Sequence, residues 1–138
     1  MNHASERTAF ENIAICIPTC QRPNMLRACL LETGKITCPD GFKINVIVAD
    51  NDASGSASKV CDDLVLPFPL HYVIEPERGL ASVRNRLLKE AILLDANWIA
   101  FIDDDEMPDP QWLLNFAIGI TRYSPDVLTG PLVQFNEG

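Results

Sequence analysis

The sequence has 138 residues, a length that accommodates one domain with a sizeable apolar core but not two full domains. Hydrophobic residues make up 47% and charged residues 22% of it, as in ordinary soluble globular proteins, which excludes a disordered or fibrous chain. The formal net charge of −8 argues against nucleic acid or an anionic membrane surface as the main partner. No apolar run approaches the length of a membrane span, so we expect no membrane segment in this chain.

The cysteines and the first residues bear on the cellular compartment. The five cysteines are odd in number and no two of them have C-x-x-C spacing, which indicates reduced thiols in a cytoplasmic protein. Residues 1–11 lack both the apolar core of a signal peptide and the basic, acid-free character of a transit peptide. We therefore expect a disordered segment over residues 1–11 and a single domain over residues 12–138.

Strands and helices are expected to alternate along the chain. Short apolar runs rich in β-branched residues predict strands, and apolar residues at helical spacing predict helices. The strands are expected at residues 13–17, where Pro18 should end the first, and at 44–49, 70–74, 98–102 and 127–135. The helices are expected at residues 23–34, 57–66, 80–96 and 111–122. This alternation predicts an α/β fold, a mostly parallel sheet with right-handed crossovers and helices on both faces.

Residues 98–102 and the acids after them are the most informative stretch. The five apolar residues have no polar member on either face, which predicts a strand buried on both sides. Residues 103–106 are all acidic and repel one another, by about 1 kcal/mol per close pair in water and about 4 at a protein surface. A divalent cation completed by substrate phosphates would relieve this repulsion. An acidic loop that merely faces water is the alternative.

Residues with useful chemistry also follow the other expected strands. In an open α/β sheet, ligands collect beyond the carboxyl ends of the strands. Carboxylates at that edge suit a metal ion or ribose hydroxyls, and arginines suit phosphate or a base. Together the strand ends outline a site for a nucleoside diphosphate. They comprise residues 18–22, 50–52, 78–79 and 103–105.

The helix expected over residues 80–96 shows an apolar stripe centred on Leu80, and the stripe also contains Val83, Leu87, Ala91 and Leu94. Arg84 falls on the same side, where an arginine is costly without a partner, so we expect it to serve the ligand or a site carboxylate. The alternative is a stem packed on the core with its charged end in water. Arg86 and Lys89 lie away from the stripe and are expected to face solvent.

Four motifs in order resemble the nucleotide-binding half of family 2 inverting glycosyltransferases. They are residues 15–23, 46–52, 78–85 and 99–105, and their order at successive strand ends makes the resemblance specific. The sequences of residues 49–52 and 101–106 look most like those of bacterial exopolysaccharide glycosyltransferases of the succinoglycan type. The resemblance implies the GT-A fold, with a Rossmann-like, mostly parallel sheet that would be truncated here.

The resemblance also implies which residues bind the nucleotide-sugar: Pro18, Thr19, Arg22, Asp50, Asp52, Gly79, Arg84, Asp103 and Asp104. Asp50 would accept the N3–H of the base. Residues 103–105 would form the D-x-D motif, in which Asp105 and Asp103 hold Mn²⁺ or Mg²⁺ against the departing nucleoside diphosphate. For Asp52, capping of the following helix together with Ser54 is the alternative.

The activity implied is that of a hexosyltransferase in polysaccharide synthesis. It would use a nucleotide-diphosphate sugar, with a UDP-sugar such as UDP-glucose favoured, and a saccharide or lipid-linked saccharide acceptor. The family's general base lies after the last expected strand, so we expect it beyond Gly138 and expect no catalytic residue in this donor-binding half. Parts of a longer protein outside these residues would hold it at the inner face of the membrane. The face that a C-terminal half would otherwise cover could form a homodimer. A nucleotidyltransferase-like enzyme and a non-catalytic nucleotide-binding module are the alternatives.

Overall fold

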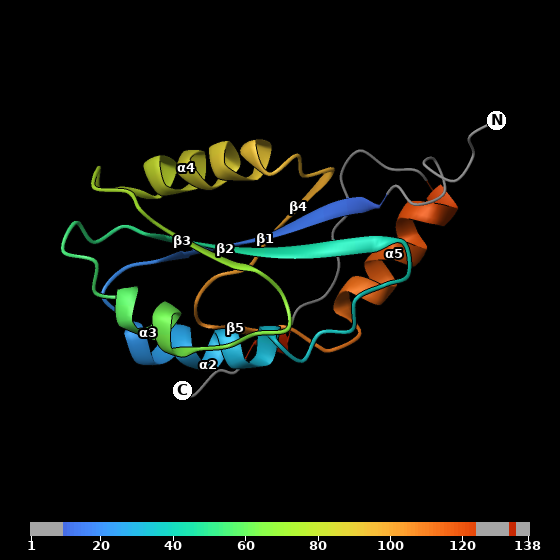
Figure 1. Cartoon of the computed structure of the whole chain (residues 1–138), viewed down its shortest axis with the longest axis horizontal. Helices are drawn as coiled ribbons and strands as arrows, with labels where there is room; N and C mark the ends of the chain where they lie inside the picture. The colour runs from blue at the N-terminus through green and yellow to red at the C-terminus, as the bar shows by residue number, and fades with distance from the viewer. Residues whose placement is uncertain (1–9, 124–132, 135–138) are drawn as a thin grey trace.

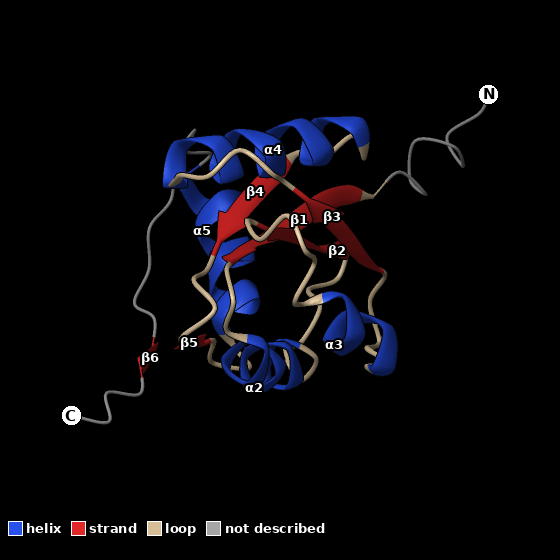
Figure 2. Ribbon diagram, turned by 90° about the vertical axis from the view of Figure 1, so that its left-hand side faces the viewer, coloured by secondary structure: helices blue, strands red, loops and turns tan. Residues whose placement is uncertain are grey.

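The computed structural model describes residues 10–123 and 133–134. Four strands form a parallel sheet in the order β3-β2-β1-β4. Figure 2 shows helix α4 on one face of this sheet and helices α2 and α3 on the other. The strands of the sheet are β1 (Glu11–Thr19), β2 (Phe42–Asp50), β3 (Leu70–Ile74) and β4 (Trp98–Phe101). These features confirm the expected α/β class with a mostly parallel sheet and helices on both faces.

The remaining elements follow the expected order along the chain (Figure 1). The helices are α2 (Pro23–Thr33), α3 (Ser58–Asp63), α4 (Leu80–Leu93) and α5 (Trp112–Tyr123). A two-stranded antiparallel sheet, which was not expected, pairs β5 (Glu106–Met107) with β6 (Val133–Gln134). The rest of the strand expected over residues 127–135, and residues 1–9 of the segment expected to be disordered, lie outside the described residues. The expectation of disorder is wrong for Glu11, which is the first residue of β1 and lies in register with Phe42 of β2.

The core forms on both faces of the two inner strands, because successive apolar side chains of β1 and β2 point to opposite faces of the sheet. One cluster of buried residues includes Ile13, Ile15 and Ile17 and packs toward the side that holds Leu26 of α2 and Leu113 of α5. The other cluster, beneath α4, is made by Ala14, Cys16, Ile47, Ala49, Val83, Leu87 and Ala91. None of the described helices is both long and apolar enough to cross a membrane.

Pro18 does not end the first strand, contrary to expectation. Strand β1 runs on to Thr19, in register with β2 up to Asp50. The carbonyl of Cys16 accepts a hydrogen bond from the N–H of Ile102, on the β4 side of the strand. Residues two apart in a strand turn their N–H groups to the same neighbour, so the donor that Pro18 lacks would have faced a position beyond the end of β4. The ladder between β1 and β2 is therefore intact.

Strand β4 is not buried on both sides, as its composition had suggested. It pairs with β1 alone among the described residues, and Phe101 at its end is 38% exposed. The half-buried Trp98 packs edge-on against Phe116 of α5, with ring centroids 5.6 Å apart. The strands buried on both faces are β1 and β2, and β4 places its carboxyl end at the border of the sheet.

Candidate functional site

The strands of the parallel sheet end at one edge of the domain, on the left in Figure 1. Because parallel strands share a direction, the loops that follow them lie at this same edge. Pro18 lies there, half-buried and in register with Ala49 of β2. The structure thus brings most of the residues expected to bind a nucleotide to one edge of the sheet, although some of their side chains are bonded within the protein and others are exposed.

Thr19, Arg22 and Asp104 form a contact between the ends of β1 and β4. The Asp104 carboxylate is fully buried and accepts hydrogen bonds from the Thr19 hydroxyl at 2.8 Å and from Nε of Arg22 at 3.2 Å. A terminal nitrogen of Arg22 forms an ion pair with the second Asp104 oxygen. Burial raises the pKa of Asp104, against the hydrogen bond from Thr19 and the charge of Arg22, which lower it. Arg22 keeps 49% of its side chain exposed and so can also reach a ligand.

Residues 103–106, called the acidic turn below, direct their side chains alternately outward and inward. Asp103 and Asp105 are exposed, whereas Asp104 and Glu106 are buried. The Glu106 carboxylate accepts the N–H of Asp103 at 2.6 Å, and the N–H of Glu106 donates to the Asp103 carbonyl at 3.0 Å. The turn is therefore closed by its own last residue. Of its acids, Asp103 and Asp105 present their carboxylates to solvent.

The charges around Asp103 act on its ionisation. Although Asp103 is exposed, the neighbouring protein partly desolvates its carboxyl and raises its pKa, and the negative charges of Glu106 and Asp105 raise it further. The positive charges of Arg84 and Arg22 lower it. The pKa still lies above its ordinary value, so further positive charge near Asp103 would favour its ionised form.

A divalent cation would supply that charge. Within the described part of the chain, no group of three or more His, Cys, Asp or Glu side chains is arranged to hold a metal ion. Ions such as Mg²⁺, however, are commonly held by one or two carboxylates and completed by substrate phosphates and water. The exposed carboxylates of Asp103 and Asp105 fit this mode, because they are close in sequence and supply hard oxygen ligands.

The acids at the end of β2 are buried instead. Asp50 is fully buried and accepts hydrogen bonds from the Tyr72 hydroxyl at 2.6 Å and from the N–H groups of Ala57 at 2.9 Å and Asp52 at 3.1 Å. Burial and the hydrogen bond to Asp50 raise the pKa of Tyr72. Interior donors therefore hold both oxygens of the Asp50 carboxylate. The expected contact of Asp50 with a nucleotide base stays a prediction.

Asp52 also makes local contacts, and the alternative of a helix cap is wrong as well. Its carboxylate accepts hydrogen bonds from the N–H of Ser54 at 3.0 Å and from the Ser54 hydroxyl at 2.8 Å. Helix α3 begins only at Ser58 and has no side-chain cap. Asp52 therefore stabilises the turn after β2, and a contact of this residue with a nucleotide stays a prediction.

Asn51 has a structural position that the sequence reasoning missed. Its side chain donates hydrogen bonds to the carbonyls of Glu75 and Glu77, both at 2.8 Å, and accepts the N–H of Gly79 at 2.9 Å. Residues 75–79 connect β3 to α4 and are called the β3–α4 loop below. The signal in the sequence was the amide between two acids, since only an amide in that run can both donate and accept.

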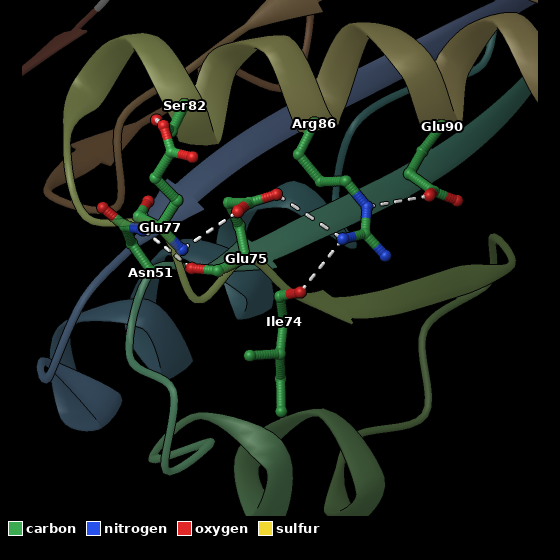
Figure 3. Close-up of polar contacts among 7 residues, drawn as sticks. All are labelled: Asn51, Ile74, Glu75, Glu77, Ser82, Arg86 and Glu90. Carbon is green, nitrogen blue, oxygen red and sulfur yellow. Dashed lines mark hydrogen bonds and ion pairs between the residues drawn. The ribbon is translucent and has the colours of Figure 1, made fainter.

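The β3–α4 loop is held from the helix side as well (Figure 3). Arg86 of α4 donates to the carbonyl of Ile74 at 3.1 Å and to Glu90 at 3.0 Å, and it forms an ion pair with Glu75 at 3.5 Å. The Ser82 hydroxyl donates to Glu77 at 2.8 Å. The expectation that Arg86 faces solvent is wrong, because the ends of β3 and α4 lie close enough for this half-buried side chain to bridge them.

Gly79 and Arg84 lie where the β3–α4 loop passes into helix α4. Gly79 precedes the helix with φ of +130°, a conformation that strongly favours glycine. The expected stripe is shifted, since Leu80 is 58% exposed and the buried residues of α4 are Val83, Leu87 and Ala91. Arg84 is exposed, and its guanidinium lies 5.9 Å from the centroid of the Phe101 ring. Its charge lowers the pKa of Asp103, and the expected service of Arg84 to the ligand or to a site carboxylate stays a prediction.

The catalytic base was expected beyond Gly138, the last residue of the sequence. Gly138 itself lies outside the described residues, so this expectation stays a prediction. Of the acids at the carboxyl edge of the sheet, Asp50 and Asp104 are bonded within the protein. Asp103 and Asp105 are the candidates for a metal ion. The edge thus carries groups suited to binding a metal ion and a phosphorylated ligand. None of these groups is assigned the role of a general base.

Comparison with known proteins gives matches over most of the chain. Residues 14–138 match the model of the family described as Glycosyl transferase family 2. The succinoglycan biosynthesis protein ExoM of Rhizobium meliloti (strain 1021) is 33% identical over 127 residues, which are 91% of this chain and 39% of ExoM. The chondroitin synthase of Escherichia coli is 25% identical over 135 residues, 94% of this chain and 18% of the synthase. The chain thus spans less than half the length of these two relatives.

Solved structures share the fold. Residues 1–349 of S. aureus TarS match with a TM-score of 0.70 and 18% identity, over 82% of this chain and 33% of the TarS chain. The same fragment in complex with UDP matches with a TM-score of 0.71 at the same identity and coverage. At this level of identity, the likeness establishes the arrangement of the strands and helices.

Proposed function

The chain belongs to glycosyl transferase family 2 and has the GT-A fold, and from this membership we propose that it binds the nucleotide-diphosphate sugar of a glycosyltransferase. The domain would comprise residues 12–138. The proposal rests on the family and on the chemistry of one edge of the sheet, since the chain covers only 39% of ExoM. The donor, the acceptor, a general base beyond Gly138 and the activity of the whole protein are therefore part of the proposal.

The observation on which the proposal depends is the pair of outward carboxylates in the acidic turn. Asp104 and Glu106 are used within the protein, whereas Asp103 and Asp105 face solvent at the carboxyl edge of the sheet. Arg22 and Arg84 lie close enough to act on Asp103 electrostatically. Carboxylates beside two arginines match a ligand that combines a divalent cation with a diphosphate.

Each residue of this edge then has a task in an inverting transfer. Asp103 and Asp105 would hold Mn²⁺ or Mg²⁺ as the D-x-D motif, and the bound ion would neutralise charge on the departing nucleoside diphosphate. Arg22 and Arg84 would contact the phosphates or the ribose. Asp104, which is buried, would keep Arg22 in place through its ion pair and would not itself reach the ribose. Pro18, Thr19 and Gly79 would line the pocket as backbone and small side chains.

The comparisons favour a UDP-sugar as the donor. TarS has been solved with UDP and with UDP-GlcNAc, and its fragment has the same fold as this chain. ExoM is named for succinoglycan biosynthesis, which supports a saccharide acceptor in the formation of an exopolysaccharide. A homodimer through the face that the rest of a longer chain would otherwise cover stays a prediction, which light scattering at micromolar concentration can test.

A thermal-shift experiment tests the proposed function. UDP, GDP and CDP are added to the wild type with Mn²⁺ or with EDTA, and the panel is repeated on Asp105→Ala. A ligand at about 100 times its dissociation constant raises the free energy of unfolding by about 2.7 kcal/mol, and hence Tm by several degrees. We expect UDP with Mn²⁺ to raise the Tm of the wild type and to leave that of Asp105→Ala unchanged.

The matched control is Asp62→Ala, which removes an exposed acid of α3. It should keep the full response to UDP and Mn²⁺. A wild type that no nucleotide stabilises at millimolar concentration, or that responds equally well in EDTA, would contradict the proposed metal-dependent donor site.

A further inference from the structure

Asn51 uses nearly all of its hydrogen-bonding capacity on one neighbouring segment. Both N–H groups of its side chain are donated to carbonyls of the β3–α4 loop, and its oxygen accepts the N–H of Gly79. The residue is 7% exposed. The side chain therefore has little surface with which to meet a ligand, and any effect on a ligand must pass through the residues that it holds.

The residues that it holds lead directly to the candidate site. Gly79 is the residue before α4, and its carbonyl accepts the N–H of Val83 in the first turn of that helix. Arg84 follows in the same helix, over the ring of Phe101 and near Asp103. In Figure 3, Asn51 and Arg86 hold the β3–α4 loop from opposite sides, one from the end of β2 and one from α4.

We propose that Asn51 is a positioning residue, which fixes the β3–α4 loop and the start of α4 and thereby sets Arg84 at the nucleotide site. This inference rests on the proposed function, because it concerns the affinity for the nucleotide. It gives Asn51, the residue that follows β2, a task at the site beside Asp50, whose carboxylate accepts hydrogen bonds in the interior.

Asn51→Asp is the sharpest variant, because it keeps the size of the side chain and the acceptor for the Gly79 N–H. It replaces the two donors by an oxygen that repels the carbonyls of Glu75 and Glu77. Asn12→Asp is the matched control. The Asn12 side chain also donates to a backbone carbonyl, that of Asp95 at 3.2 Å, but it lies at the opposite end of β1.

Two measurements on the full chain test the positioning role. Amide hydrogen exchange should be faster at residues 75 and 77–79 in Asn51→Asp and unchanged there in Asn12→Asp. Calorimetric titration with UDP and Mn²⁺ should show an affinity about tenfold lower for Asn51→Asp, as expected for residues coupled through one network. Asn12→Asp should bind UDP as the wild type does.

A double-mutant cycle separates positioning from general destabilisation. If Asn51 acts through Arg84, then Asn51→Asp should lower the affinity less than about twofold when Arg84→Ala is already present. An equal tenfold loss in both backgrounds would overturn the inference, as would unchanged exchange in the β3–α4 loop or unchanged affinity despite a loosened loop. A wild type that binds no UDP would overturn the proposed function and this inference together, so the two failures are distinguishable.

Discussion

Two acidic segments, residues 50–52 at the end of β2 and the acidic turn after β4, look alike in the sequence but are used differently. At the end of β2, the exposed fractions of Asp50, Asn51 and Asp52 are 0%, 7% and 8%, and all three side chains bond to the protein itself. In the acidic turn, Asp103 and Asp105 stay exposed. Carboxylates at a strand end are therefore available to a ligand only where the protein supplies no donors for them.

The position of each strand in the sheet explains the difference. Strand β2 lies between β1 and β3, so its end is surrounded by donors such as the Tyr72 hydroxyl of β3 and the N–H of Ala57 before α3. Strand β4 lies at the border of the described sheet, where fewer elements surround its end. The acids at the interior strand end thus serve the fold, whereas Asp103 and Asp105 at the border strand end are open to solvent and to the proposed ligand.

The comparison predicts its largest effect for Asp50→Ala. The substitution leaves the Tyr72 hydroxyl and the Ala57 N–H without their acceptor in the interior, which should lower the free energy of unfolding by about 3 kcal/mol. Urea denaturation measures the loss as a lower midpoint. Tyr72→Phe removes one of the donors and keeps the ring, so it should cost about 1 kcal/mol. A loss for Asp50→Ala as small as that of Tyr72→Phe would contradict the structural role.

A smaller effect is expected for Asp104→Asn, within the acidic turn. The variant keeps the shape but ends the ion pair with Arg22, and it should lower the free energy of unfolding by about 2 kcal/mol. The effect is smaller than for Asp50 because Arg22 is half-exposed and can turn to water. In the same denaturation experiment, Asp109→Asn should change stability by less than about 0.5 kcal/mol, because this exposed residue accepts only a local N–H. Equal losses of unfolding free energy in Asp104→Asn and Asp109→Asn would contradict the distinction between buried and exposed acids.

The fold was largely predictable because its signals are local. The third strand begins and ends where expected, at Leu70–Ile74, and the helix that begins at Pro23 was marked by proline and by apolar spacing. The border position of β4 was not predictable from its apolar residues. Trp98 packs edge-on against Phe116, a residue of a helix and not of a neighbouring strand.

The candidate site was predictable as a place but not in its details. The order of the motifs located the edge of the sheet, and Thr19, Arg22 and Asp104 do meet there. Which carboxylates turn inward depends on donors that arrive from distant elements, such as the Tyr72 hydroxyl that occupies Asp50. The spacing of residues along the chain does not predict such contacts between distant elements.

Apart from the control Asp109→Asn, the smallest expected effect belongs to Asp103→Asn, and it has the opposite sign. The pKa of Asp103 is raised above its ordinary 3.8, first by partial desolvation and then by Glu106 and Asp105. The folded protein therefore holds this proton more tightly than the unfolded chain, and the ionised carboxylate destabilises the fold at neutral pH. Asp103→Asn should raise the free energy of unfolding at pH 7 by less than about 1 kcal/mol, while it weakens the binding of UDP with Mn²⁺.

The pH dependence tests this sign. As the pH falls through the raised pKa of Asp103 and then below 3.8, this carboxyl becomes protonated in the wild type, so the difference in Tm between the two proteins should shrink toward zero. Thermal denaturation of both proteins across this range measures the difference, and 1 M salt at pH 7 should reduce it by screening, since the Debye length is then only about 3 Å. A variant less stable than the wild type at pH 7 would show that the outward carboxylate stabilises the fold, and the contrast with Asp50 would then fail.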